Sequence, residues 1–258
     1  RGIEEVASKH KYNVIIIQSL DSYEKEVQDV KTMYSSRVDG LIVSLAMESV
    51  KYQHFEPYLK MTYPLVLADR ITNDMDTDKV MIDNFSAAYE ATNHLIKQGY
   101  KRIGHLAGAQ QQLVYKRRLE GYVAALRDHG IQQEEKLIYH SRLSHEDGRD
   151  GAMSLLKLSE KPDAVFAAND TSAVGFMQYV EEAGLSIPQD IGVVGFNNDL
   201  ISSIVKPQLT TVDHPGIEIG RKAAELVLDK LHNKSLNTIP QTVTFRTQLI
   251  VRNSSVRD

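Results

Sequence analysis

Three short polar clusters directly follow apolar runs that have the composition of buried strands. The clusters are Asp69-Arg70, Asn169-Asp170 and Asn197-Asn198-Asp199. In an open parallel sheet, ligands bind just beyond the carboxyl ends of the strands, which is where these clusters fall. An asparagine amide both donates and accepts hydrogen bonds, and an aspartate accepts from paired hydroxyls. The clusters therefore predict a cleft for a small, hydroxyl-rich ligand.

The same residue types also begin helices, because Asp and Asn side chains accept hydrogen bonds from the free backbone N–H groups of the first turn. We expect this capping role for Asp170. For Asp69, Asn169 and Asn197 we favour ligand binding over capping.

A run of three cations, Lys116-Arg117-Arg118, falls in the first turns of a helix predicted over residues 115–129. Cations are disfavoured there, because a helix N-terminus carries partial positive charge. One explanation is that Arg118 reaches into a cleft as a planar fork for hydroxyl or carboxylate oxygens. The other is that the run forms a solvated basic surface, and the residues alone leave both open.

Motifs for catalysis and metal binding are absent from the sequence. It contains no Gly-x-Ser-x-Gly elbow, no phosphate loop ending in Gly-Lys-Ser/Thr and no His-Glu-x-x-His. Asp74, Asp76 and Asp78 alternate, but they lack the glycine and the distal glutamate of a calcium loop, so we expect a solvated loop. We therefore expect no catalytic residues, no metal and no cofactor, and we do not expect an enzyme.

Alternating strands and helices must position the polar clusters. Strands are predicted at residues 14–17, 40–44, 64–68, 81–82, 102–107, 136–139, 164–168, 191–196 and within 242–251. Between them, helical patterns cover residues 22–36, 52–60, 84–98, 115–129, 148–158, 170–183 and 216–232. Such alternation indicates an α/β fold with parallel sheets covered by helices on both faces. About ten strands exceed one ordinary sheet, so we expect two Rossmann-like lobes.

Composition narrows the class of protein. The formal net charge is -4, with 30 basic and 34 acidic residues, so these residues alone are a poor surface for DNA phosphates. There is no cysteine, which fits a reducing cytoplasm. No apolar run approaches the roughly 20 residues of a membrane span, and the first residues have no signal-peptide core. We expect a cytoplasmic protein.

Six segments, in order and with suitable spacing, resemble the lactose-repressor (LacI) family of transcription regulators. They are residues 64–70; Asp83-Asn84 with residues 94–103; Arg118-x-x-Gly121-Tyr122; Ala167-Ala168-Asn169-Asp170-x-x-Ala173-x-Gly175; residues 184–196; and Leu209-Thr210-Thr211-Val212 with Gly220-x-x-Ala223. Together they cover nearly the whole chain.

The resemblance implies a type I periplasmic-binding-protein-like fold with three hinge crossovers. The N-terminal lobe would comprise residues 1–83 and 213–240, and the C-terminal lobe residues 84–212 and 241–258. It also implies a homodimer that binds operator DNA through a headpiece. The family's helix-turn-helix, hinge helix and first core strand are not in this sequence, and a sheet without its first strand exposes an unpaired edge.

The resemblance further implies which residues contact a small-molecule effector. They are Asp69, Arg118, Leu143, Asn169, Asn197 and His214. Two of them depart from the family pattern. Asn197 stands where an aspartate is usual, and Leu143 replaces a common aromatic platform, which weakens the case for a flat ring ligand.

The sequence thus predicts the effector-sensing core of a DNA-binding repressor, with a sugar or sugar derivative as effector. Binding would shift the arrangement of the lobes and thereby the affinity for operator DNA. The alternative is a transport-type sugar-binding protein of the same fold.

Overall fold

Alternating strands and helices form two units, each with its own parallel sheet. The computed structural model describes residues 1–60, 63–233 and 239–257. Unit 1 comprises residues 1–82 and 215–245, and unit 2 comprises residues 83–214 and 246–258. The chain passes between the units three times, after Ile82, His214 and Phe245. The predicted lobe ranges include residues 61–62, 234–238 and 258, which lie outside the described residues.

The sheet of unit 1 has the strand order β1-β2-β3-β9, and its neighbours are parallel. Its strands are β1 (Leu41–Val43), β2 (Leu65–Ala68), β3 (Asp78–Ile82) and β9 (Thr242–Phe245). Residues 242–245, which we expected in the C-terminal lobe, pair with β3 in this sheet. Their register with residues 79–82 makes them the strand that completes unit 1 after α9 (Gly216–His232).

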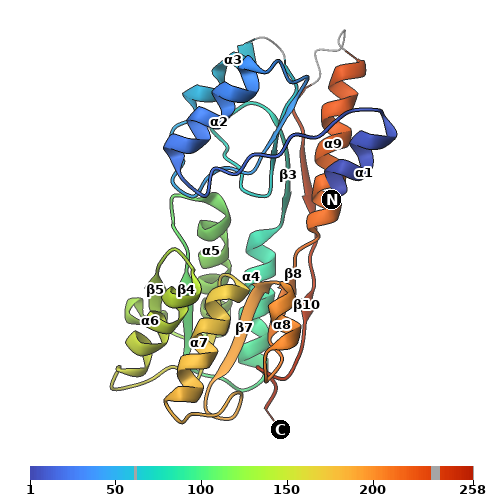
Figure 1. Ribbon diagram of the computed structural model, residues 1–258. Helices are drawn as coiled ribbons and strands as arrows, with labels where there is room; N and C mark the ends of the chain where they lie inside the picture. The colour runs from blue at the N-terminus through green and yellow to red at the C-terminus, as the bar shows by residue number, and fades with distance from the viewer. Residues whose placement is uncertain (61–62, 234–238, 258) are drawn as a thin grey trace. The chain divides into compact units, whose positions relative to one another are not determined.

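Helices cover both faces of this first sheet (Figure 1). They are α1 (Gly2–Lys9), α2 (Tyr23–Ser35), the 3₁₀ turn η1 (Gln53–Phe55), α3 (Glu56–Lys60) and α9. Helix α9 contacts β1, β2 and β3 and packs against α1. The four residues of β2 are all buried, as expected for a strand covered on both faces.

The predicted strand at residues 14–17 is wrong. Val14, Ile15, Ile16 and Ile17 form no strand, and their exposed fractions run from 39% to 81%. β-Branched residues favour a strand only where a neighbouring strand accepts their backbone hydrogen bonds. Among the described residues, β1 is an edge strand paired with β2 alone, and residues 14–17 pair with no strand.

Asp78 also differs from its predicted place in a solvated loop. It begins β3, and its side chain is almost fully buried. Its carboxylate accepts hydrogen bonds from Lys230 Nζ at 2.7 Å and from the backbone N–H of Gln241 at 2.8 Å. The paired charge fixes β3 to the strand and helix beside it, so this aspartate has a structural role.

The sheet of unit 2 has the strand order β10-β8-β7-β6-β4-β5. Its strands are β4 (Ile103–Ala107), β5 (Ile138–His140), β6 (Ala164–Ala167), β7 (Gly192–Asn197), β8 (Thr210–Asp213) and β10 (Leu249–Ile250). All neighbours are parallel except β10, which runs antiparallel to β8.

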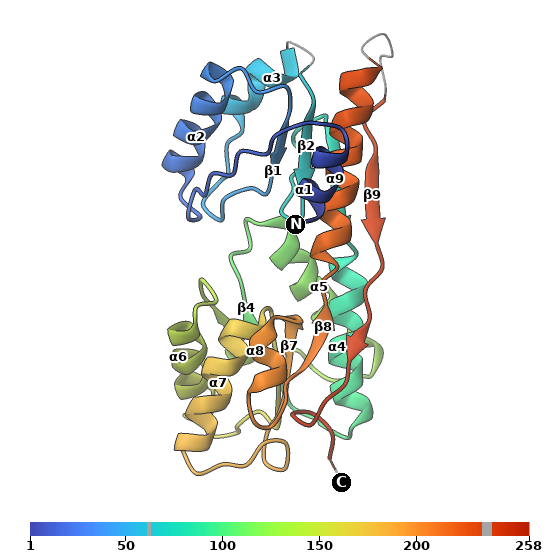
Figure 2. The same ribbon diagram turned by 45° about the vertical axis from the view of Figure 1, so that its right-hand side comes forward.

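Two helix pairs cover opposite faces of this second sheet (Figure 2). The first pair is α4 (Asn84–Lys97) with α5 (Leu113–Asp128), and the second is α6 (His145–Leu156) with α7 (Asp170–Glu182). A 3₁₀ turn, η2 (Glu135–Leu137), leads into β5, and the short helix α8 (Leu200–Ile204) follows β7. Helix α8 was not predicted.

Glycines allow α6 and α7 to pack with their backbones in contact. A Cβ atom on Gly175 would lie 2.0 Å from the carbonyl oxygen of His145, and one on Gly148 would lie 2.1 Å from that of Ser172. No side chain fits at either position without separating the helices. The glycine in the Asn169-to-Gly175 motif is therefore explained by packing.

Gly175→Ala should lower the free energy of unfolding by about 2–3 kcal/mol, because overpacking shifts backbone rather than a flexible side chain. At an open helical position the same change would raise it by about 1 kcal/mol. Urea unfolding measures the difference, with Ser154→Ala on the exposed face of α6 as the control. A stabilised Gly175→Ala variant would contradict the close helix packing.

Candidate functional site

Arg118 is buried at the centre of the predicted site in unit 2, with a side chain only 4% exposed. Its Nε donates to Asn84 Oδ1 at 2.8 Å, and its Nη1 donates to the carbonyl oxygen of Ala168 at 2.5 Å. Its guanidinium carbon lies 3.6 Å from the centroid of the Phe196 ring. Arg118 thus connects α4, the end of β6 and the end of β7.

This environment explains a cation near the start of α5. A carbonyl oxygen, an amide oxygen and an aromatic face all stabilise a guanidinium, and together they offset the unfavourable helix terminus. The interpretation as a solvated basic surface is wrong for Arg118. It holds for Lys116 and Arg117, which are exposed, and Arg117 forms an ion pair with Glu120 at 2.8 Å.

Asn169, rather than Asp170, is the N-cap of α7. Its Oδ1 accepts from the backbone N–H of Ser172 at 2.9 Å, and its Nδ2 donates to the carbonyl oxygen of Leu143 at 3.0 Å. The expectation that Asp170 caps this helix is therefore wrong. Since an amide nitrogen carries two hydrogens and this contact uses one, Asn169 retains donor capacity for a ligand.

Asn197 and its neighbour Asn198 have different surroundings at the end of β7. Protein groups hold both ends of the Asn198 amide, which donates to Asp213 Oδ1 at 3.0 Å and accepts from Arg252 Nη2 at 2.8 Å. Asn197 is half-buried, and within the described residues its side chain has no hydrogen-bond partner. Its φ of 111° lies in a region that asparagine tolerates better than most residues.

Leu143 and His214 lie at the margins of this arrangement. Leu143 is 2% exposed and belongs to the apolar core of unit 2. Its side chain packs in that core, and its carbonyl oxygen accepts a hydrogen bond from Asn169 Nδ2. His214 directly follows β8 and is half-buried.

Asp69 belongs to unit 1. It follows β2, has a φ of 63°, and its backbone N–H donates to the carbonyl oxygen of Val80 at 2.9 Å. Arg70, the other member of this polar cluster, forms an ion pair with Asp21 at 2.6 Å within the same unit.

The chain order of unit 2 explains why Arg118, Asn169 and Asn197 converge. After β4 the chain adds β5 on one side and then β6 on the other, so the strand order reverses beside β4. Ligands bind outside the carboxyl ends of strands at such a switch point. Arg118 contacts the residue before Asn169 and the residue before Asn197, which places all three at this edge of the sheet.

The sequence did not reveal the contacts of two residues beside the site. Asp83 caps α4, and Asn84 is buried against Arg118. Asp170 is fully buried, and this burial raises its pKa to about 7 although Thr211 and Asp199 donate hydrogen bonds to it. Both belong to the motifs that resemble the family, but only the three-dimensional packing reveals what they contact.

Glu26, Ser49 and His54 form a polar cluster within unit 1 whose order of hydrogen bonds is not that of a catalytic triad. In unit 1, Glu26 accepts from Ser49 Oγ at 2.7 Å and lies 2.9 Å from His54 Nε2. The serine hydroxyl thus donates to the carboxylate and not to the imidazole, which is not the order of a nucleophile and its base.

Among the described residues, no group of three or more His, Asp or Glu side chains is placed to hold a metal ion. No described helix is long and apolar enough to span a membrane.

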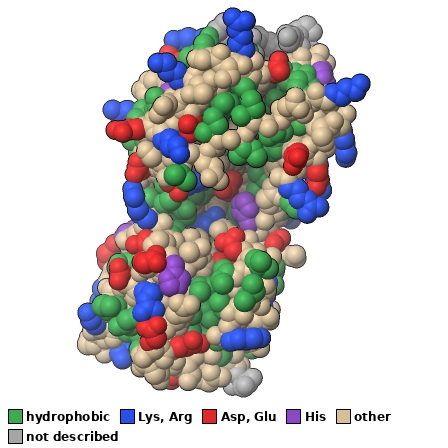
Figure 3. Space-filling view, in the orientation of Figure 1, with side chains coloured by type: hydrophobic (Ala, Val, Ile, Leu, Met, Phe, Trp, Pro, Cys, Tyr) green, Lys and Arg blue, Asp and Glu red, His purple; other side chains and the backbone are tan. Residues whose placement is uncertain are grey.

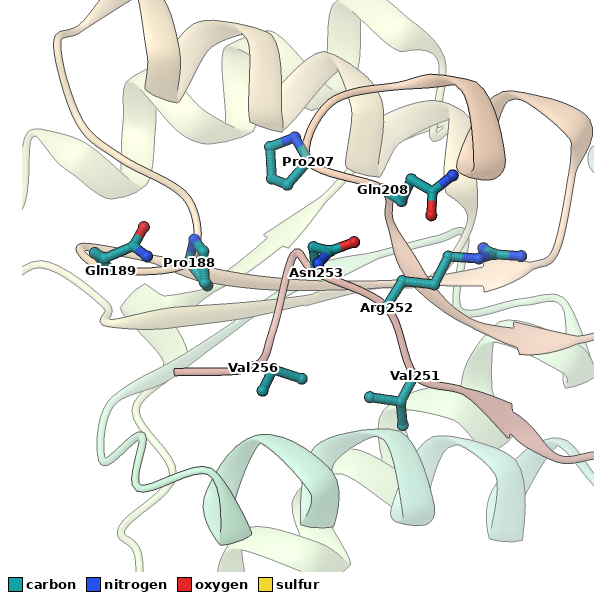
Figure 4. Close-up of a pocket in the computed structure, with 8 residues that line it drawn as sticks. All are labelled: Pro188, Gln189, Pro207, Gln208, Val251, Arg252, Asn253 and Val256. Atoms are coloured by element: carbon teal, nitrogen blue, oxygen red, sulfur yellow. The ribbon is translucent and has the colours of Figure 1, made fainter. Parts of the chain in front are cut away.

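A hollow of about 570 Å³ lies at the other edge of the second sheet (Figure 4). Pro188 and Gln189 precede β7, and Pro207 and Gln208 precede β8, so the hollow adjoins the amino ends of these strands. The guanidinium of Arg252 points away from it and donates to Ser202, Leu209 and Asn198. The charged group of Arg252 is therefore bound by protein acceptors and is not directed into the hollow.

Relatives with known names match nearly the whole chain. The family described as "Periplasmic binding protein-like domain" matches residues 92–255. Catabolite control protein A of Priestia megaterium is 31% identical, over 95% of this chain and 75% of the relative. The transcriptional repressor CytR of Escherichia coli K12 is 32% identical, over 99% and 74%. The ribose operon repressor of Haemophilus influenzae is 32% identical, over 92% and 70%.

Solved structures of transcription regulators have the same fold. CcpA of Lactococcus lactis superposes with a TM-score of 0.89 and 27% identity, covering 98% of this chain and 92% of that one. A LacI family regulator of Enterococcus faecium with bound ribose superposes with a TM-score of 0.87 and 26% identity, and the match covers 99% of this chain and 91% of that one. The regulator CelR in complex with cellobiose superposes with a TM-score of 0.88 and 26% identity, and the match covers 98% of this chain and 76% of that one.

Proposed function

This chain belongs to the LacI family of transcription regulators, and we propose that the effector sensed by its core is a sugar. The periplasmic-binding-protein-like fold and the effector-sensing role are those of the family. The observation that carries the sugar proposal is the convergence of Arg118, Asn169 and Asn197 at the switch point of the second sheet. Sugar hydroxyls both donate and accept, which suits one guanidinium beside two amides.

Three further observations support a sugar over a flat aromatic ligand. Leu143 is buried and offers no stacking surface, and Phe196 is covered by Arg118. Two structural relatives were solved with ribose and with cellobiose. We propose ligand contacts for Arg118, Asn169, Asn197 and His214 in unit 2. In unit 1, Asp69 stays a predicted ligand contact.

The mechanism that we propose is a shift of population. The sugar binds one arrangement of the two units better than the other, and it can move the equilibrium only by that difference in affinity. In the whole regulator the affinity for operator DNA then changes, and operator binding changes sugar affinity reciprocally. The three chain passages at Ile82, His214 and Phe245 are the hinges in this proposal.

A transport-type binding protein is the alternative on the same fold. The named relatives are repressors and regulators, which favours regulation. We accordingly propose a cytoplasmic protein that does not turn its ligand over. Recovery of unchanged sugar after long incubation would support this, and a reaction product would contradict it.

Isothermal titration calorimetry with D-ribose, cellobiose and a ribonucleoside tests the ligand class. We expect one of the two sugars to bind, with one site per chain. Binding of the nucleoside alone would overturn the sugar proposal, since it would require a stacking surface that Leu143 does not provide.

We also propose that the regulator is a homodimer, and α8 offers a surface for a second copy. Leu200 and Ile204 on this helix are 77% and 59% exposed, and apolar side chains gather over α8 (Figure 3). Exposed apolar patches of this kind mark protein interfaces.

Ile204→Glu should weaken dimerisation at least about tenfold, because burying an unpaired carboxylate costs more than 1.4 kcal/mol. Sedimentation equilibrium measures the dissociation constant. Met153→Glu, at a position of α6 that is 37% exposed, is the matched control and should leave it unchanged. An unaltered constant for Ile204→Glu would exclude α8 from the interface.

A further inference from the structure

Asp170 joins three segments of unit 2 that carry candidate ligand contacts. Its Oδ1 accepts from the Thr211 hydroxyl on β8 at 2.6 Å, and its Oδ2 accepts from the backbone N–H of Asp199 at 2.7 Å. It directly follows Asn169 at the start of α7. Its side chain is fully buried, so water does not substitute for these partners.

Thr211 extends this connection to the turn after β7. Its hydroxyl oxygen accepts from the backbone N–H of Asn198 at 3.2 Å while its hydrogen is donated to Asp170. Both backbone N–H groups that follow Asn197 are therefore fixed, one directly by Asp170 and one through Thr211. Since Asn197 and Asn198 both have positive φ, this turn needs such restraint to keep one conformation.

The neighbouring strand leaves room for the carboxylate. A Cβ atom on Gly195 would lie 2.2 Å from Asp170 Oδ1, so a side chain there would displace Asp170. The glycine of the Gly195-Phe196-Asn197 segment is thus explained by the aspartate that packs over it.

We propose that Asp170 is a positioning residue for the effector site, which fixes the Asn197–Asp199 turn to the first turn of α7 so that Asn197 and Asn169 face one ligand. The inference rests on the proposed function. It adds a residue that does not touch the ligand and acts through Thr211 and the backbone of the turn. Simple helix capping does not explain it, because Asn169 already caps α7.

The connection has a spectroscopic signature that does not depend on any ligand. The amide proton of Asp199 should shift as Asp170 ionises, because it donates directly to that carboxylate. Burial raises the pKa of Asp170 to about 7, far from that of an exposed aspartate. Other charged groups on the surrounding elements are Asp199 itself, Asp213 on β8, Arg118 on α5 and Arg252 near the C-terminus.

Nuclear magnetic resonance of the whole chain between about pH 5 and pH 8 tests the proposal. In the wild type we expect the chemical shift of the Asp199 amide proton to change with pH as Asp170 ionises. In Asp170→Asn we expect that change to disappear. A titration that survives in Asp170→Asn would belong to another group and would overturn the proposal. Identical Asp199 amide shifts in the wild type and in Asp170→Asn at every pH would overturn it as well, because they would show that this amide does not donate to the carboxylate.

Thr211 supplies a matched pair of variants for the indirect connection. Thr211→Val keeps the shape and removes the hydroxyl, so resonances of residues 197–199 should shift and a bound sugar should bind about tenfold more weakly, the equivalent of one hydrogen bond. Thr211→Ser keeps the hydroxyl and should restore both. Equal behaviour of the two variants would contradict positioning through the hydroxyl.

Tyr100→Phe separates positioning from general destabilisation. It removes a buried hydrogen bond to the carbonyl oxygen of Pro188, at the amino end of β7. We expect it to lower stability and leave residues 197–199 and sugar affinity unchanged. If the wild type binds no sugar, the proposed function fails, whereas the Asp199 titration still decides the role of Asp170.

Discussion

Arg118→Ala should weaken sugar binding by a factor of about 100 to 1,000. Truncating a buried charged hydrogen-bonding group at a binding site costs about 2–5 kcal/mol, and each 1.4 kcal/mol corresponds to a factor of ten. The loss has two sources here. The ligand loses its guanidinium contact, and Asn84 and Ala168 lose the donor that orders the site around them.

The same substitution should lower the free energy of unfolding by about 2–4 kcal/mol, because it leaves two buried acceptors unsatisfied. Two controls separate binding from folding. Arg117→Ala removes an exposed cation one residue away, and Tyr122→Phe removes a buried hydrogen bond to Ile103 from the same helix. Both should retain sugar affinity in calorimetry. Arg118→Ala with wild-type affinity would invalidate the site.

The second large effect is a pH-dependent difference in stability between the wild type and Asp170→Asn. Burial raises the pKa of Asp170 from 3.8 to about 7 in the folded protein. Between these values the folded chain holds a proton that the unfolded chain has lost. Raising the pH therefore favours the unfolded state, and wild-type stability should fall from about pH 4 to about pH 7 relative to the variant.

The size of the difference follows from the linkage between protonation and folding. A shift of about three pKa units corresponds to about 4 kcal/mol as an upper order of magnitude, since one unit is 1.36 kcal/mol. Urea unfolding at several pH values measures this difference in the free energy of unfolding. As a control, Tyr122→Phe should differ in stability from the wild type by the same amount at every pH in this range. A wild type that gains stability over Asp170→Asn as pH rises would show that the carboxylate is ionised and well solvated by its donors.

The spacing of apolar residues along the sequence was sufficient to predict most of the helices and strands. The predicted helix at residues 216–232 coincides with α9. The strands predicted at residues 64–68, 102–107 and 164–168 contain β2, β4 and β6. These elements are covered on both sides, so their composition reflects burial directly. The periplasmic-binding-protein-like fold expected from the motifs is confirmed by the solved relatives.

The failures have a common physical cause, which is that the outcome depends on a distant partner. Residues 14–17 have strand composition, yet a strand also needs a neighbour to pair with. Asp78 was predicted to be solvated because its ion-pair partner, Lys230, is far from it in the sequence. The terminal segment 242–251 contains β9 and β10, which pair in different sheets, and its composition gives no sign of the division.

The candidate site could be predicted as a set of positions but not as a set of contacts. Strand-end placement correctly suggested that Asn169 and Asn197 lie at one edge of a sheet, because β6 and β7 are parallel neighbours. It could not show that the Arg118 guanidinium lies over the Phe196 ring, or that Asn169 caps α7 while Asp170 is buried. Those facts depend on packing between helices α4, α5 and α7.

Hydrogen–deuterium exchange of the chain with and without its sugar tests most directly whether the effector binds at the switch point of unit 2. We predict that the sugar slows exchange in three segments of this unit, namely residues 113–122, 168–173 and 195–200. Protection confined to the hollow lined by Pro188, Pro207 and Val251, or to unit 1 alone, would contradict the account.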